Sequence, residues 1–239
     1  MRIPVLCYHR IETPPASAPR DSNFTEPSRF SEHLAMLATC GMTGVSIGAI
    51  ALWQRGLCTL PPRPVAITFD DAYASVPESG LPQLVARGWS ATIFAVSGQL
   101  GGTNAWDAGA PVATLLTAAA LRDATAAGFE IGSHSQRHRN LKAQPAAVLD
   151  DELAGSRNVL EQQLGSAVRS FAFPYGSHDR HALQHVGHAG YDAACTLKRW
   201  ANSRRSNPLR MGRLSAGGPI SSSMLFLKLS KLMLTPARQ

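Results

Sequence analysis

Two adjacent aspartates, Asp70 and Asp71, directly follow an apolar run of strand-forming residues at Val65–Phe69. Neighbouring carboxylates repel each other, and burying either one without a partner is costly. A bound cation would offset both penalties, so the pair indicates a metal site. The alternative is that the two side chains cap a helix that follows the strand.

Two histidines, His134 and His138, lie four residues apart in the segment GSHSQRH. If the chain forms a helical turn after His134, the two imidazoles point the same way, with Cβ atoms about 5–6 Å apart. One carboxylate and two imidazoles commonly hold a divalent ion that keeps open positions for water and substrate. The spacing also suits two surface histidines, but the aspartate pair favours the metal site. One aspartate would then bind the ion, and the other would take a proton from the water it activates.

Short apolar runs that end in polar residues alternate with longer stretches of helical period. The predicted strands are Ile3–His9, Val65–Phe69, Ala91–Val96, Phe129–Ser133, Val168–Phe173 and Tyr191–Thr196. One predicted helix starts after an N-cap at Ser28. The other predicted helices span Leu81–Arg87, Leu115–Ala127, Pro145–Leu164 and Arg180–Ala189. Loops are predicted over Ala105–Ala113 and Lys198–Gly218. This alternation predicts an α/β fold with parallel strands, either a barrel or an open doubly wound sheet. In both folds the carboxyl ends of the strands carry the chemistry, which would bring the aspartates and histidines together.

The composition is typical of one globular domain, with a positive charge that suits an anionic partner. Of the 239 residues 44% are hydrophobic, and the formal net charge is +7. The four cysteines show no CxxC or paired spacing, so we expect free thiols in a reducing compartment. The N-terminal apolar stretch is too short for a signal peptide, and no run approaches the ~20 apolar residues of a membrane span. We therefore expect a cytoplasmic protein, with peripheral attachment to the inner membrane face as an extension of that expectation.

Three motifs, TFDDAY, SHSQRH and FAFPYG, resemble in order and spacing those of the NodB-type polysaccharide deacetylases, carbohydrate esterase family 4. The likeness extends from about Ile3 to Leu214. Within this family the chain most resembles the exopolysaccharide and biofilm poly-N-acetylglucosamine deacetylases. Their first strand ends in YH, as the segment VLCYHRI indicates here, and their third motif is similar to FAYPYG. The resemblance implies a distorted (β/α) barrel with fewer units than a TIM barrel. It also implies hydrolysis of an N-acetyl group on a hexosamine.

The resemblance further assigns roles to the motif residues. Asp70 would be the general base, and Asp71, His134 and His138 would hold a divalent metal, usually zinc, with cobalt or nickel as alternatives. The backbone N–H of Tyr175 would stabilise the oxyanion of the tetrahedral intermediate.

Contacts with the substrate are predicted for three further residues. Pro174 holds the segment before the oxyanion donor rigid, and Trp106 and Asp107 lie on a loop where they could stack on and hydrogen-bond a sugar ring. The alternative for the tryptophan is a loop anchor. Four other histidines have the spacing of a polar helix face and are not assigned to the site: His178, His181, His185 and His188.

Two features of many family members are missing. Ala172 stands where they carry an arginine that orients the base, and no histidine follows His188 to supply the general acid. In the biofilm subgroup an N-terminal histidine supplies the acid, which implies that His9 protonates the leaving amine. The alternative is that His9 caps a backbone carbonyl. Arg213 is a candidate to pair with Asp70 in place of the missing arginine.

Residues 221–239 are predicted to form a basic amphipathic helix after a deacetylase domain at residues 1–220. The apolar face of this helix is formed by Leu225, Leu229 and Leu232. This face either packs on the barrel or lies on an anionic membrane, supported by the preceding basic segment. We expect no nucleic-acid binding, because no aromatic-interleaved basic patch or nucleic-acid-binding motif accompanies the charge.

These observations predict a metal-dependent hydrolase that acts on an N-acetylated glycan, either a cell-surface polysaccharide or its lipid-linked precursor. One alternative keeps the chemistry but changes the substrate to another acylated sugar or a small amide. A second alternative is a saccharide-binding protein that has lost catalysis. Asp70 favours an enzyme, because binding alone needs no base beside the metal.

Overall fold

A curled sheet of parallel strands forms the centre of the computed structural model, which describes residues 1–16, 18 and 23–234. In spatial order the strands are β10 (Ala193–Cys195), β9 (Ser170–Ala172), β8 (Glu130–Ser133), β7 (Thr92–Ala95), β6 (Pro64–Phe69), β2 (Val5–Tyr8) and β12 (Leu214–Ser215). Each neighbouring pair is parallel, and β5 (Thr43–Val45) pairs with the first half of β6. This arrangement is the distorted (β/α) barrel that the sequence predicted.

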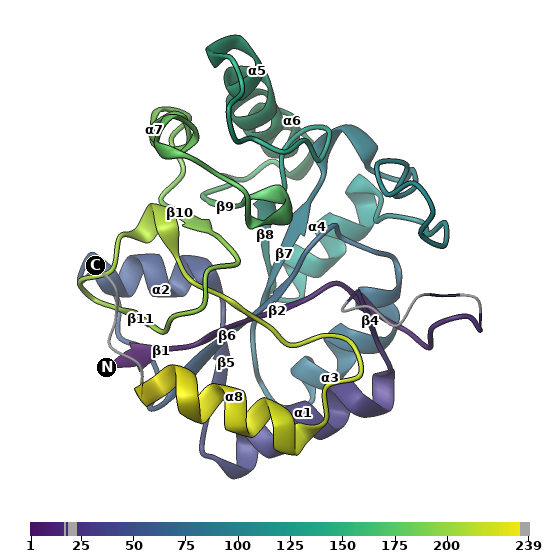
Figure 1. Ribbon diagram of the computed structural model, residues 1–239, viewed down its shortest axis with the longest axis vertical. Helices are drawn as coiled ribbons and strands as arrows, with labels where there is room; N and C mark the ends of the chain where they lie inside the picture. The colour runs from purple at the N-terminus through teal and green to yellow at the C-terminus, as the bar shows by residue number, and fades with distance from the viewer. Residues whose placement is uncertain (17, 19–22, 235–239) are drawn as a thin grey trace.

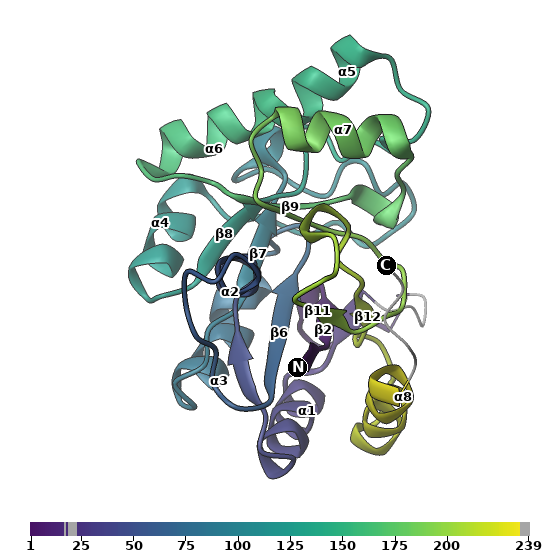
Figure 2. The same cartoon turned by 90° about the vertical axis from the view of Figure 1, so that its left-hand side faces the viewer.

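Helices connect the strands and cover the outside of the sheet, as Figures 1 and 2 show from two sides. They are α1 (Pro27–Thr39), α2 (Ile47–Gln54), α3 (Leu81–Val85), α4 (Ala118–Ala126), α5 (Ala146–Asp150), α6 (Ser156–Leu164), α7 (Arg180–His188) and α8 (Ser222–Leu234). Two minor strand pairs lie beside the sheet, β1 (Arg2–Ile3) with β11 (Asn202–Ser203) and β3 (Arg10–Ile11) with β4 (Phe24–Thr25).

The strands form where apolar, β-branched and aromatic residues follow one another. All six residues of β6, with the sequence PVAITF, are buried. A parallel strand covered on both faces has this continuous apolar character, because helices lie on one side and the barrel interior on the other. The polar residues that follow such a strand therefore lie at the carboxyl rim of the barrel.

A short segment near the C-terminus joins the two edges of the sheet. Met211 pairs with the last residue of β10, and Leu214 pairs with β2. Arg213 thus lies between the two edge strands. The predicted loop over Lys198–Gly218 was wrong, because this segment gains its strand character from pairing with strands distant in the sequence.

Besides the two-residue strands β3, β4, β11 and β12, the strand β5 and the helix α2 were not predicted from the sequence. β5 has only three residues, and α2, with the sequence IGAIALWQ, is apolar on nearly every side and shows no amphipathic period. Its start does carry a local signal, because the Oγ of Ser46 accepts a hydrogen bond from the backbone N–H of Ala49 at 3.2 Å.

Two predicted helices differ in detail from those observed. Helix α1 begins after Glu26, which makes no side-chain capping hydrogen bond, so the prediction of Ser28 as the N-cap was wrong. The single helix predicted over Pro145–Leu164 is interrupted by a π-helical turn at Asp151–Gly155. Such turns often occur at functional sites, and this one carries Glu152, which accepts hydrogen bonds from the loop that follows β8.

Helix α8 packs beside α1 on the outside of the barrel (Figure 1). Its three leucines, Leu225, Leu229 and Leu232, are all buried. Packing on the barrel is therefore the supported alternative, and membrane contact through this face is not, because the face is already covered. Among the described residues, no helix is long and apolar enough to cross a bilayer.

A buried histidine joins α1 to the sheet and makes stability depend on pH. Nε2 of His33 donates to the carbonyl oxygen of Ile220 at 2.8 Å, so Nδ1 accepts from the hydroxyl of Tyr8 at 3.0 Å. Burial lowers the pKa of His33 below its ordinary value of 6.5. The unfolded chain therefore binds this proton more readily, and the stabilisation present above pH 6.5 is lost as the pH falls toward the folded pKa.

We therefore expect the free energy of unfolding to fall less steeply in His33→Gln than in the wild type between about pH 7 and pH 5. Urea unfolding of both proteins at these two pH values measures the difference. Because His134 is also buried and neutral, only the comparison with the variant isolates His33. Equal slopes in the two proteins would contradict this assignment.

Candidate active site

Asp70 and Asp71 lie at the carboxyl end of β6, where the chain turns sharply. Asp71 and Ala72 adopt the left-handed backbone conformation, with φ of 70° and 58°. Residues other than glycine rarely do so outside turns and functional sites. Both carboxylates are buried. Neither aspartate caps a helix, because the next helical turn begins after Ser75.

The two histidines follow β8 on a tight loop. The helical turn expected after His134 was wrong, because Ser135 and His138 have left-handed φ values of 68° and 56°. The Oγ of Ser135 accepts a hydrogen bond from the backbone N–H of His138 at 3.0 Å, which closes the loop. This loop still brings both imidazoles to one site, with ring centroids 4.9 Å apart.

The carboxylate of Asp71 lies between the two imidazoles. Its Oδ1 is 3.4 Å from Nε2 of His134 and 3.2 Å from Nε2 of His138. The three side chains are buried, and their ligand atoms lie within 4.8 Å of one another. Among the described residues, Asp71 Oδ1 is a buried oxygen without a hydrogen-bond partner. A divalent cation would satisfy this oxygen, so the three residues fit a metal site.

A hydrogen bond at Nδ1 of His134, the ring nitrogen that faces away from Asp71, fixes the tautomer of the imidazole. Nδ1 lies 2.8 Å from the carbonyl oxygen of Ala172, which can only accept, so Nδ1 carries the hydrogen. In the neutral ring Nε2 then holds the lone pair that faces Asp71. Burial lowers the pKa of His134 to about 4 despite the nearby carboxylates. The ring is therefore neutral at pH 7 and able to bind an ion.

Arg213 fixes the second aspartate. Its Nη1 and Nη2 donate to Oδ1 and Oδ2 of Asp70 at 2.6 and 2.7 Å. The buried guanidinium also donates to Thr68 Oγ1 and to the carbonyl oxygen of Thr196, both at 3.1 Å. Burial alone would raise the pKa of Asp70, but Arg213 and His134 hold it well below its usual range. The predicted pairing is confirmed, and this arginine supplies the contact that the third motif lacks.

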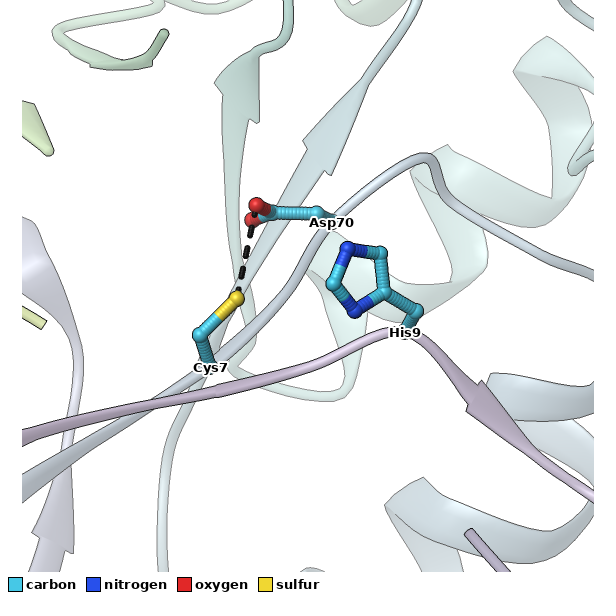
Figure 3. Close-up of side chains that lie close together, drawn as sticks. All are labelled: Cys7, His9 and Asp70. Atoms are coloured by element: carbon cyan, nitrogen blue, oxygen red, sulfur yellow. Dashed lines mark hydrogen bonds between the residues drawn. The ribbon is translucent and has the colours of Figure 1, made fainter. Parts of the chain in front are cut away.

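Cys7 and His9 approach Asp70 from β2 and the residue after it (Figure 3). Sγ of Cys7 donates to Asp70 Oδ2 at 3.4 Å, and burial raises the pKa of this thiol, which therefore keeps its proton. Nδ1 of His9 is buried without a hydrogen-bond partner among the described residues. No feature of the sequence singles out Cys7. The position of His9 beside a carboxylate suits a proton-transfer group.

Tyr175 lies beside His138, the second histidine of the cluster. It sits in the turn Pro174–Gly176 with a left-handed φ of 60°. Its hydroxyl is 3.2 Å from Nδ1 of His138, and its side chain is largely exposed. The backbone N–H of Tyr175 donates to no acceptor among the described residues, which leaves it available to a ligand.

A cleft of about 200 Å³ brings the predicted residues together. Its walls include His9, Asp70, Asp71, Trp106, Asp107, His134, His138 and Tyr175. The ring of Trp106 stacks on that of His138, with centroids 4.6 Å apart and an interplanar angle of 20°. Pro174 is buried and does not line the cleft, so its contribution would be to position the backbone of Tyr175.

Comparison with known families identifies the family of the chain. Residues 58–194, more than half of the chain, match the polysaccharide deacetylase family. The chain belongs to the polysaccharide deacetylase family. It is therefore a hydrolase of the polysaccharide deacetylase type, which cleaves amide bonds, as the sequence predicted.

Known members of the deacetylase family share this architecture. The chain is 23% identical over 222 residues to the putative polysaccharide deacetylase YxkH of Bacillus subtilis, covering 93% of this chain and 74% of that one. The Streptococcus pyogenes deacetylase PplD, solved with acetate, superimposes with a TM-score of 0.82 at 20% identity, covering 95% of this chain and 98% of that one. A de-N-acetylase from Aggregatibacter actinomycetemcomitans gives a TM-score of 0.80 at 21% identity, covering 95% and 100%. These structures confirm the deacetylase fold.

In this deacetylase a buried glutamate that the sequence did not indicate supports the histidine loop. Oε2 of Glu152 accepts hydrogen bonds from the backbone N–H groups of Gln136 and Arg137 at 3.0 and 2.8 Å. Its other oxygen lies 3.4 and 3.6 Å from the side chains of Arg137 and Arg139. Glu152 is fully buried. Glu152 directly follows Asp150 and Asp151, so no local sequence signal distinguishes this buried carboxylate from its two neighbours.

We expect Glu152→Gln to lower the free energy of unfolding by roughly 1–3 kcal/mol, because hydrogen bonds to a charged acceptor are replaced by neutral ones. Since the loop carries His138, metal affinity should also fall, by about tenfold. Urea unfolding and a metal titration measure the two effects. The control is Glu32→Gln, which removes an exposed ion pair with Arg29 and should change stability by less than about 0.5 kcal/mol. Equal behaviour of the two variants would contradict this role.

Proposed function

We propose that this deacetylase is metal-dependent and removes N-acetyl groups from hexosamine residues of a cell-surface polysaccharide or of its lipid-linked precursor. Zinc is the proposed ion, with cobalt or nickel as alternatives. The observation that carries the proposal is the buried cluster of Asp71, His134 and His138 beside a separate carboxylate, Asp70. Family membership supports the polysaccharide substrate.

Asp71, His134 and His138 would hold the ion. Two imidazole nitrogens and one carboxylate oxygen form a donor set that zinc accepts in catalytic sites, where a further position stays open. When bound, the ion would polarise the acetyl carbonyl and activate a water molecule. Both oxygens of Asp70 accept hydrogen bonds from Arg213, and its Oδ2 lies 3.9 Å from Nε2 of His134. Asp70 is therefore beside the three proposed ligands, where it would act as the base.

The proton transfers are assigned to two residues that directly follow the neighbouring strands β6 and β2. Asp70 takes a proton as the oxygen of the attacking water forms a bond to the acetyl carbon. His9 gives a proton to the hexosamine nitrogen as the carbon–nitrogen bond breaks, which releases acetate and leaves a free amine. Both side chains line the cleft, as both roles require.

Three residues at the cleft wall are proposed to bind the substrate. The free backbone N–H of Tyr175 would donate to the oxyanion. The aromatic ring of Trp106 would pack on a sugar ring, and the carboxylate of Asp107 would accept hydrogen bonds from sugar hydroxyls. The exposed ring of Tyr175 adds a second apolar surface.

The test is acetate release from N-acetylglucosamine oligomers by the purified protein, first metal-free and then reloaded with zinc, cobalt or nickel. We expect release only after reloading, and none from Asp71→Ala. Stoichiometric metal binding without release would favour another acylated sugar, a small amide or a saccharide-binding role. A protein that binds no metal at its active site would contradict the proposal.

A further inference from the structure

A second pair of metal-ligating side chains lies on α7, outside the cleft. His181 and His185 are four residues apart, so their side chains share one face of the helix. His181 is exposed, and the side chain of His185 retains partial exposure. The two ring centroids are 4.5 Å apart, and the two Nε2 atoms are 3.0 Å apart. The sequence alone indicates only a polar helix face at these positions.

An aspartate on the neighbouring helix orients one of these rings. Nδ1 of His185 lies 2.7 Å from Oδ1 of Asp150, the last residue of α5. Because a carboxylate accepts, Nδ1 carries the hydrogen, and Nε2 of the neutral ring carries the lone pair. This lone pair faces His181. A carboxylate that holds the far nitrogen of a histidine is the usual support of a metal-bound imidazole.

The distance between the two nitrogens suits a tetrahedral ion. Zinc binds imidazole nitrogen at about 2.0–2.1 Å, so two nitrogens at the tetrahedral angle are roughly 3.3 Å apart. The observed separation is 3.0 Å. The ring of His181 is exposed, and a small rotation of it accommodates the difference. Because the pair lies at the surface, water can complete the coordination shell.

We propose that His181 and His185 bind one divalent transition-metal ion, with Asp150 as the residue that orients the second ligand. Imidazole ligands select zinc, copper(II) or nickel(II), whereas magnesium and calcium prefer oxygen ligands. The ligands come from α7, and none of them lines the catalytic cleft. The site is therefore separate from the proposed catalytic metal and does not depend on it.

An ion at this site would also strengthen the contact between α5 and α7. His185 would bind the ion through its Nε2 atom and, at the same time, donate a hydrogen bond from its Nδ1–H to Asp150. Since only the folded chain brings the two histidines and the aspartate together, excess zinc should raise the melting temperature. This rise should be smaller in a variant that lacks the histidine pair.

Calorimetric zinc titration of the untagged, metal-free full chain tests the proposal. We expect two equivalents in the wild type and one in His181→Gln/His185→Gln. Asp71→Ala should keep the equivalent at the α7 site. Asp150→Asn should weaken that equivalent by about 10–100-fold. The matched control is His188→Gln, on the same helix with its ring centroid 6.1 Å from that of His185, which should keep both equivalents.

The possible outcomes separate this site from the catalytic one. Two equivalents in His181→Gln/His185→Gln, or a single equivalent that this double substitution leaves intact, would overturn the proposal. A single wild-type equivalent that the substitution abolishes would support the α7 site and contradict the proposed catalytic metal. Circular dichroism checks that each variant is folded, and glutamine on an exposed helix face should preserve folding.

Discussion

Asp70→Asn is expected to lower the rate of acetate release by about 10²–10⁴-fold while the protein still binds its metal. The amide cannot accept the proton of the attacking water, whereas the proposed ligands Asp71, His134 and His138 remain. The measurements are kcat on N-acetylglucosamine oligomers and the metal content of the same preparation. A loss of turnover without loss of metal would separate the base from the ligands.

The matched control for this experiment is Asp192→Asn. Asp192 is a half-buried aspartate that pairs with Arg169 at 3.2 Å and lies outside the cleft. The same chemical change there should leave turnover within a factor of about two, since surface ion pairs contribute little. If Asp70→Asn retained wild-type turnover at full metal occupancy, Asp70 would not be the base.

Arg213→Met is expected to destabilise the fold by about 3–5 kcal/mol, because it leaves the buried carboxylate of Asp70 without its cationic partner. Methionine fills most of the volume but donates none of the four hydrogen bonds that the guanidinium makes. Urea unfolding measures the loss. The free energy of unfolding of Arg213→Lys should lie between those of the wild type and Arg213→Met, because an ammonium group keeps the charge but not the bidentate geometry.

A double-mutant cycle shows whether this loss comes from the pair itself. With Asp70 replaced by asparagine, the buried negative charge is gone, and Arg213→Met should cost at least about 1 kcal/mol less than in the wild-type background. Additive effects of the two substitutions would mean that Arg213 acts through packing, not through Asp70. The cycle reports stability, so it does not depend on knowing the substrate.

The residues of the active site could be identified from the sequence because each follows a recognisable strand. Asp70 and Asp71 follow a continuous apolar run, and His134 follows the short segment FEIGS, which was also predicted as a strand. Parallel strands place their carboxyl ends at one rim, so side chains 64 positions apart in the sequence were expected to meet, and they do. The motif order then pointed to the deacetylase family, which the comparison confirms.

The supports of the site were harder to predict, because they act across the fold. Glu152 lies in a π-helical turn, and its carboxylate accepts hydrogen bonds from backbone N–H groups of the histidine loop. Nothing in the sequence around Glu152 specifies that contact. The left-handed residues in the loop, Ser135 and His138, replaced the helical turn that the spacing suggested. A serine side chain that bonds a nearby backbone N–H competes with helix formation.

The sequence by itself determined the order of the longer strands and helices and the identity of the chemical groups at the strand ends, because these depend on local periodicity and residue type. Only the tertiary structure decided how those groups are oriented and held. Arg213 reaches Asp70 because Met211 and Leu214 join opposite edges of the sheet, a pairing between strands remote in the chain. Likewise, the apolar face of α8 is covered because α8 packs against α1, a helix remote in the sequence. Contacts of this kind arise from long-range packing, which local pattern does not encode.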